Sequence, residues 1–187
     1  MPRCHRWLAL LLGAAAATPA LAAFDYSGTK TLLAVMGDGT RSPVGSVAFT
    51  PVASGATQFK ISWRHEVFTD HFLSMREFKC LPGGPEISCQ VPYPYAQPGT
   101  VAPGQHAWLE HSLLFLHKSP AEFGAKLWNG LYFVLREQGN ALVGEPQAVD
   151  LNEIGAPPAR LEVPPFGPAK RHEVPAGSRW LRQLVIE

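Results

Sequence analysis

The sequence predicts a mainly β protein, a small barrel or a sandwich of antiparallel strands with one or two short helices. Three observations lead to this fold class. The chain has 17 Gly and 18 Pro among 187 residues, which favours many short elements joined by turns over a helical bundle. Several apolar runs alternate with polar residues, as strands with one buried face do. Turn dipeptides such as Asp38-Gly39 stand between such runs.

Composition and charge narrow the class of protein further. With 46% hydrophobic and 17% charged residues the chain is typical of a globular protein, and its length favours a single domain. Its 16 basic and 15 acidic residues leave a net charge of +1. A nearly neutral chain has no strong field for nucleic acid or anionic lipid, so we expect no nucleic-acid partner.

The first 22 residues have the pattern of an export signal. Arg3 and Arg6 precede an apolar run over residues 7–17, and Ala20-Leu21-Ala22 offers small residues to a signal peptidase. Eleven helical residues rise only about 16 Å, too little for a hydrocarbon core of roughly 30 Å. We therefore expect cleavage near Ala23, no stable membrane anchor afterwards, and a periplasmic or extracellular domain over residues 23–187.

Two cysteines remain after that cleavage, Cys80 and Cys89. An even number of cysteines in an oxidising compartment favours a disulfide bond. Residues 81–88 between them are rich in Gly and Pro, and both flanks have strand-like sequences. The sequence therefore predicts a disulfide at the base of a hairpin. A redox-active pair would have the Cys-x-x-Cys spacing, which is absent here.

The strands expected along the chain follow from alternation and turn residues. In residues 59–63, apolar Phe59, Ile61 and Trp63 alternate with polar neighbours, and we expect the run 72–81 to be the antiparallel partner of this strand. Since residues 180–186 end on an apolar run, they suit an interior or a closing strand. The other expected strands cover residues 29–36, 44–52, 131–135 and 141–143.

One region favours a helix. Ser119-Pro120-Ala121-Glu122 has a capping Ser, a Pro at the first helical position and a Glu at the third, which predicts a helix to about Trp128. Residues 106–117 fit either a helix or a buried strand. Residues 91–98 and the Pro-rich segment 156–177 are expected to be extended and irregular.

The densest group of polar residues is His65, Glu66, Asp70 and His71. If these residues cap a hairpin between the runs 59–63 and 72–81, the two histidines face each other across strands about 5 Å apart. Glu66 or Asp70 would then add an oxygen ligand for a divalent metal, and His106, His111 or His117 would add a nitrogen from elsewhere. The alternative is a solvated hairpin tip, because His-x5-His is not a recognised ligand spacing.

A second His/Glu group lies at His106, Glu110 and His111. On a helix Glu110 and His111 point to different sides of the axis, and His106 lies about 140° from His111, which is poor geometry for chelating a metal ion. We expect them to cap the helix or to lie on the surface.

Tyr93 and Tyr95 lie on a Pro-rich segment and are expected to be exposed. Exposed tyrosines make good contact residues for a partner protein, although an ordinary rigid loop would have the same sequence. Most other aromatic residues are expected to fill the core, and a minority would line a cavity.

Common catalytic signatures such as Gly-x-Ser-x-Gly and His-Glu-x-x-His are absent from the sequence. The leading hypothesis is therefore an exported, non-catalytic β-rich protein that binds a small apolar ligand or an envelope partner protein, with no cofactor. The first alternative is a metal-dependent enzyme or metal-binding protein using His65 and His71. The second is a protein inhibitor or envelope-assembly factor acting through Tyr93 and Tyr95.

Overall fold

The computed structural model describes residues 23–53, 55–73 and 76–187, so the expected export signal lies outside the described residues. In the described part, one antiparallel sheet contains β1 (Gly28–Met36), β2 (Arg41–Pro51), β3 (Thr57–Trp63), β4 (Thr69–Leu73), β5 (Arg76–Leu81), β6 (Ile87–Gln90), β7 (Thr100–Val101), β8 (Phe115–Lys118), β9 (Gly130–Gln138), β10 (Ala141–Val149), β11 (His172–Glu173) and β12 (Leu181–Ile186). The helices are α1 (Ala107–His111) and the 3-10 turns η1 (His65–Val67), η2 (Leu151–Ile154) and η3 (Pro168–Lys170). The predicted β class is confirmed, and none of these helices is long and apolar enough to cross a membrane.

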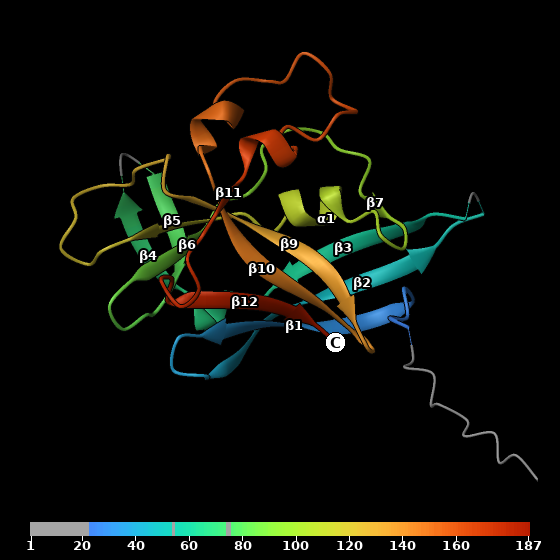
Figure 1. Cartoon of the computed structure of the whole chain (residues 1–187), viewed down its shortest axis with the longest axis horizontal. Coiled ribbons are helices and arrows are strands. Elements are labelled where there is room, and N and C mark those ends of the chain that lie inside the picture. Colours follow the sequence, from blue (N-terminus) through green and yellow to red (C-terminus); the bar gives the residue numbers. More distant parts are fainter. Residues whose placement is uncertain (1–22, 54, 74–75) are drawn as a thin grey trace, which may run out of the picture.

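The sheet is open and strongly curved. Its strand order is β4-β5-β6-β8-β9-β10-β12-β1-β2-β3-β7, with β11 attached to β10, and within the described residues no pairing joins β4 to β7 (Figure 1). The curvature brings β3 over β8, where the rings of Trp63 and Phe115 meet edge to face at 6.0 Å. Of the two architectures expected, the structure is therefore not a closed barrel and is better described as sandwich-like.

The structure confirms three of the predictions about strands, namely two hairpins and one interior strand. β1 and β2 form a hairpin around residues 37–40, and β9 and β10 form another around Gly139-Asn140. β12 pairs with β10 on one side and β1 on the other, so it is the interior strand that its apolar sequence predicted.

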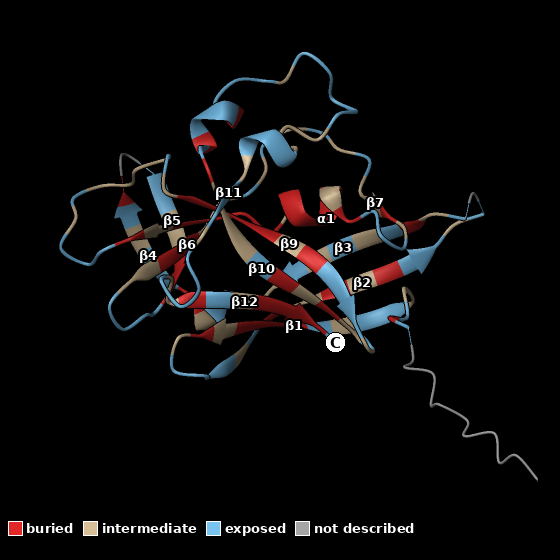
Figure 2. Cartoon of the chain, viewed as in Figure 1, coloured by how far each residue is buried: buried red, intermediate tan, exposed pale blue. Residues whose placement is uncertain are grey.

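Both faces of the central strands are buried. On β8 and β9, Phe115 and Phe133 belong to one apolar core, which lies inside the curved sheet. Their neighbours Leu116 and Tyr132 point to the opposite face and belong to a second core. This second core is closed by η2 and by Phe166 of the Pro-rich segment, which crosses the upper side of the molecule (Figure 2). Strands that are covered on both faces have continuous apolar sequences. Residues 113–116 have such a sequence, which is why it fits a helix as well as it fits a buried strand.

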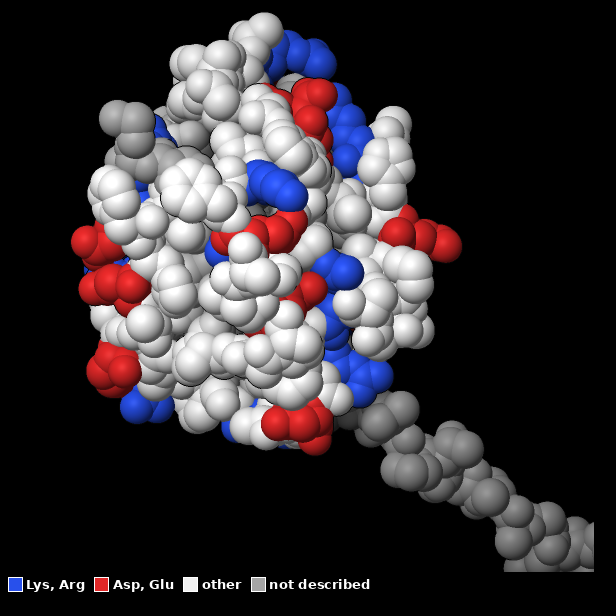
Figure 3. All heavy atoms as spheres, turned by 90° about the vertical axis from the view of Figure 1, so that its left-hand side faces the viewer, with Lys and Arg blue, Asp and Glu red and all other residues white. Residues whose placement is uncertain are grey.

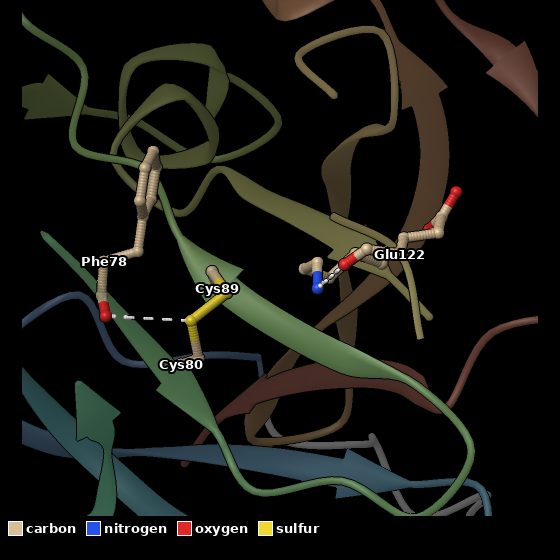
Figure 4. The surroundings of a disulfide bond; sticks show 5 residues. Phe78, Cys80, Cys89 and Glu122 are labelled. Carbon is tan, nitrogen blue, oxygen red and sulfur yellow. Dashed lines mark hydrogen bonds between the residues drawn. A yellow bond between two sulfur atoms is a disulfide. The ribbon is translucent and has the colours of Figure 1, made fainter. Parts of the chain in front are cut away.

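The expected disulfide is present at the base of a hairpin. Cys80 on β5 and Cys89 on β6 are directly paired in the ladder and their sulfur atoms are bonded (Figure 4). Both cysteines are fully buried in the second core. The bond therefore joins adjacent strands, as the sequence predicted.

The prediction that the strand at residues 59–63 pairs with the run 72–81 is wrong. β3 pairs with β2 and β7, whereas β5 pairs with β4 and β6, at the other end of the sheet. Between β3 and β4 the chain turns through η1, and Phe68 is buried against Trp63 at 5.8 Å between ring centroids. Alternation identifies the buried face of a strand but does not identify its neighbour.

The helix expected over residues 119–128 is also wrong. The capping contacts form, because the Ser119 amide donates to Glu122 Oε2 at 2.9 Å, but the segment continues as turns. The buried Lys118 donates from Nζ to the Glu122 carbonyl oxygen at 2.6 Å, and that oxygen is the acceptor a following helical turn would need (Figure 4). Gly124 then adopts a φ of 69°, which ends any helix.

Candidate functional site

Helix α1 lies where the edge of β9 has no strand beside it. β8 pairs only with Gly130 and Leu131 at the start of β9, which leaves the later residues of β9 without a ladder on that side. Two side chains of the α1 segment take over at Leu135. Its amide donates to Glu110 Oε1 at 2.8 Å, and its carbonyl oxygen accepts from His106 Nδ1 at 3.3 Å. Buried backbone groups require hydrogen-bond partners, and the Leu135 amide and carbonyl find theirs in Glu110 and His106. This requirement explains why charged and polar residues of a short helix are buried.

Glu110 is 6% exposed and both of its oxygens are engaged. Its Oε2 accepts a hydrogen bond from the Tyr132 hydroxyl at 2.5 Å. Burial, together with the Glu110 carboxylate, raises the pKa of Tyr132 well above its usual value. Tyr132 is therefore a fixed hydrogen-bond donor that holds the carboxylate in place.

Arg171 lies over the ring of the same tyrosine. Its guanidinium carbon is 5.0 Å from the centre of the Tyr132 ring, a cation–π contact. Its Nε is buried and has no hydrogen-bond partner, and among the described residues Arg171 forms no ion pair. A half-buried guanidinium without an anion is costly, so an anionic ligand in contact with Arg171 would be stabilised.

A cavity of about 630 Å³ is bordered by these groups. Glu110 and Arg171 line it together with Arg136 of β9, and Trp108, Val134 and Pro164 contribute apolar wall. Its size lies within the roughly 300–1,000 Å³ that is usual for small-molecule sites. We call it the α1 cavity.

A chain of hydrogen bonds runs from the α1 cavity to the surface. His106, which lines the cavity, shares a hydrogen bond of 2.6 Å with the Tyr26 hydroxyl, and that hydroxyl donates to Glu137 Oε1 at 2.7 Å. The rings of His106 and Tyr26 are stacked at 5.9 Å. These contacts fix the wall of the cavity around His106.

His111 has a structural role behind the cavity. It is fully buried, donates from Nδ1 to the Ala107 carbonyl oxygen at 2.6 Å, and accepts at Nε2 from the Phe166 amide at 3.1 Å. Burial lowers its pKa to about 4, and the nearby Arg171 acts in the same direction. The expected surface role of residues 106–111 is wrong, because His106, Glu110 and His111 are all buried. His106 does stand at the N-cap position of α1, although its side chain makes no capping hydrogen bond.

A second polar cluster joins Glu86, His117 and Arg179. Arg179 Nη1 lies 2.9 Å from Glu86 Oε2 and 2.5 Å from His117 Nδ1, and it ties β8 to the segment before β12. Burial lowers the pKa of His117 to about 4, with Arg179 adding to the effect. Burial also raises the pKa of Glu86, and Arg179 opposes that shift. Because these groups satisfy one another, the cluster holds segments together.

The residues proposed as metal ligands do not lie in the arrangement that was expected. His65 is exposed on η1, and His71 lies on β4 opposite Phe78 of β5, so the two histidines are not a cross-strand pair. Glu66 forms an ion pair with its neighbour Arg64 at 2.9 Å, and Asp70 forms one with Lys79.

Over residues 23–53, 55–73 and 76–187, no group of three or more His, Cys, Asp or Glu side chains is placed to hold a metal ion. The metal hypothesis stays a prediction, without the geometry on which it rested.

Tyr93 and Tyr95 are half-buried, so their expected exposure is wrong. Their rings meet edge to face at 5.7 Å and pack against the second core. The Tyr95 hydroxyl donates to the Ile154 carbonyl oxygen at 3.0 Å. Their role as partner contacts stays a prediction, but much of their surface is used inside the fold.

Sequence reasoning missed Arg171 altogether and misplaced Glu110. Arg171 lies in the Pro-rich segment, 61 positions after Glu110, and no motif links the two. The short helical pattern before residue 113 did place His106 and Glu110 one turn apart, which is the available signal for a shared role. No protein-family model matches this chain, and no curated protein or solved structure matches it significantly.

Proposed function

We propose that this is an exported, non-catalytic binding protein that holds a small ligand in the α1 cavity. The observation that carries the proposal is the guanidinium of Arg171, which borders the cavity without an ion-pair partner among the described residues. Charged groups that are half-buried in this way are usually paired, and a ligand would supply the missing partner.

The walls of the cavity support ligand binding on a rigid frame. Trp108 is on α1 and Val134 is on β9, so the apolar wall belongs to elements that are anchored to each other through Glu110. A site on packed elements is preorganised, which lowers the entropy lost on binding. The predicted apolar ligand fits this part of the wall, while Arg171 favours a ligand that also carries a polar group.

Binding is favoured over catalysis by the way the titratable groups are used. Glu110 receives hydrogen bonds from Tyr132 and Leu135 on separate oxygens, and His111 uses both ring nitrogens within the fold. A general acid or base needs a free position toward a reacting atom. These contacts instead support a role in shaping the cavity.

The proposal can be tested by NMR titration of the labelled protein with four small probes of different chemistry, namely indole, benzoate, benzylammonium and glucose. At least one probe is expected to shift the backbone amides of Gln105, Trp108 and Val134, which border the cavity, and to leave those of the β4–β5 end unchanged. Saturating shifts confined to the cavity would support the proposal. If no probe shifts these amides, or if shifts spread evenly over the surface, the proposal is wrong.

A matched pair of variants makes the assignment specific. Arg171→Met removes the guanidinium while keeping an unbranched side chain at the cavity, and Arg160→Met makes the same change at an exposed position. The first substitution should weaken binding of the preferred probe and the second should leave it unchanged. Equal effects of the two would show that overall charge, and not the cavity, determines binding.

Exposed aromatic side chains favour the second form of the hypothesis, an envelope partner protein. Phe123 is 101% exposed, Phe72 78% and Trp128 61%. The face at the β4–β5–β6 end is largely uncharged, with acidic and basic side chains interspersed (Figure 3). Affinity capture from an envelope extract with the wild type and with Phe123→Ser tests this candidate. A partner retained equally by both proteins would contradict a role for this side chain.

A further inference from the structure

We infer that the ligand of the α1 cavity is a small carboxylic acid with a hydrogen-bond donor next to its carboxylate. Arg171 binds the carboxylate and Glu110 accepts from the donor. The inference rests on the proposed binding function and adds the chemical class of the ligand. A 2-hydroxy acid and an α-amino acid both have this chemistry, since the donor is a hydroxyl in one and an ammonium in the other.

The anionic part of the ligand follows from the two arginines. Arg171 and Arg136 both line the cavity, and neither forms an ion pair or a hydrogen bond with another described side chain. A guanidinium presents donors in a planar fork that matches a carboxylate. Arg171 is held in position by the Tyr132 ring, so its fork is already oriented before a ligand arrives.

The donor part follows from Glu110. Its carboxylate lines the cavity and accepts one hydrogen bond on each oxygen, from Tyr132 and from Leu135. A carboxylate has about four lone-pair positions, so acceptor capacity remains on the cavity side. An aliphatic or purely anionic group against this oxygen would leave a buried acceptor unpaired or add like charge, whereas a hydroxyl or ammonium would satisfy it.

Tyr132 fixes the spacing of the two contacts. Its hydroxyl donates to Glu110 and its ring lies under the Arg171 guanidinium, so one aromatic side chain positions both charged groups. Glu110 and Arg171 are not in ion-pair contact with each other. The two groups therefore line the α1 cavity as separate charges instead of neutralising each other. A ligand with an anion and a donor on neighbouring atoms offers a partner to each of them.

The charges of the cavity favour a monoanion over a phosphate. Two arginines and one glutamate line the cavity, so basic side chains outnumber acidic ones by one. One carboxylate neutralises that excess, while a phosphate dianion would be repelled by Glu110.

Four probes that share a phenyl group test the inference by calorimetry and NMR. Mandelate carries a carboxylate and a hydroxyl, phenylglycine a carboxylate and an ammonium, phenylacetate only the carboxylate, and 2-phenylethanol only the hydroxyl. Mandelate or phenylglycine should bind about tenfold more tightly than each of the other two, because one charge-assisted hydrogen bond is worth about that factor. Which of the two binds better distinguishes a hydroxy acid from an amino acid.

Variants assign the two contacts separately. Arg171→Met should remove the advantage of phenylacetate over 2-phenylethanol, and Glu110→Gln, which keeps an amide oxygen but loses the negative charge, should reduce the advantage of the donor-bearing acid over phenylacetate. Arg160→Met, at an exposed position, is the matched control and should change nothing. Glu110 also supports β9 through the Leu135 amide, so the Glu110→Gln protein is used only if it shows a cooperative melting transition. The ranking of the four probes on the wild-type protein tests the inference without this variant.

The outcomes separate the inference from the proposed function. If all four probes bind with equal affinity in the cavity, or if 2-phenylethanol binds best, the cavity is a binding site but the ligand class is wrong. If phenyl phosphate binds more tightly than mandelate, the monoanion argument is wrong. If none of these probes binds while indole does, the proposed function stands and the carboxylate assignment is overturned.

Discussion

Lowering the pH from 7 to 4 should destabilise the protein through His111, because this histidine is neutral in the folded state and gains a proton on unfolding. Its ring donates to the Ala107 carbonyl oxygen and accepts from the Phe166 amide, an arrangement that only the neutral tautomer satisfies. Burial lowers its pKa from 6.5 to about 4. Between these two values the unfolded chain binds more protons than the folded one, so the free energy of unfolding decreases as the pH falls.

The magnitude follows from the size of the shift. Each pKa unit corresponds to about 1.4 kcal/mol, so a decrease from 6.5 to about 4 corresponds to about 3 kcal/mol for His111 alone. The contribution is fully present above pH 6.5 and is lost progressively down to pH 4. His117 acts in the same direction, and acidic groups titrate at the lower end of the range. A variant is therefore needed to isolate His111.

His111→Gln is the variant that isolates it. Glutamine retains an acceptor for the Phe166 amide but has no titrating group, so it should cost about 1–2 kcal/mol at pH 7 through lost contacts. Urea unfolding at pH 7, 6, 5 and 4.5 measures the difference in free energy between the two proteins. That difference should shrink and then reverse as the pH falls, while the exposed His172→Gln control should not show the crossover. A constant difference between pH 7 and 4.5 would refute the assignment of a neutral buried His111.

Three further predictions concern the disulfide, the core and the export signal. Reduction, or Cys80→Ser with Cys89→Ser, should lower the free energy of unfolding by about 2–3 kcal/mol, since the bond closes a short loop; unchanged urea midpoints would contradict this. Trp63→Ala should cost about 2–3 kcal/mol because the side chain is half-buried against the core, whereas Lys60→Ala on the exposed side of the same strand should stay within about 0.5 kcal/mol. A large bulky residue in place of Ala22 should leave an uncleaved precursor by intact mass, and a mature chain still starting at residue 23 would show that the cleavage site is misplaced.

Local features of the structure were largely determined by the sequence itself. The alternation of Phe59, Ile61 and Trp63 with polar neighbours predicted which side of β3 faces the core, and the structure confirms it. The spacing of Cys80 and Cys89 around a Gly/Pro-rich segment predicted the stapled hairpin. Such features depend on interactions between residues close in the chain, and these interactions leave a periodicity or a turn signal that can be identified.

Pairing between distant segments was decided only by the tertiary structure. Strand β3 has the sequence of a strand with one buried face, but that alternation does not say whether it pairs with β2 or with β5. The helix expected after Ser119 has its capping residues in place, yet the segment continues as turns, with the buried Lys118 bonded to the Glu122 carbonyl oxygen. In both cases contacts made only in the folded chain outweigh a local preference worth less than about 1 kcal/mol per residue.

In the candidate site too, the sequence determines the local spacing of residues and the tertiary structure determines their contacts. The sequence places His106 and Glu110 one turn apart, but it contains no sign that both would be buried against the free edge of β9, or that Arg171 would lie over Tyr132. Burial of Glu110 follows from an unpaired backbone amide at Leu135, which exists only because β8 is too short to cover β9. A cavity is made by elements that meet in space and not in sequence. Only the fold brings a carboxylate and a guanidinium 61 residues apart onto one tyrosine, the first at its hydroxyl and the second over its ring.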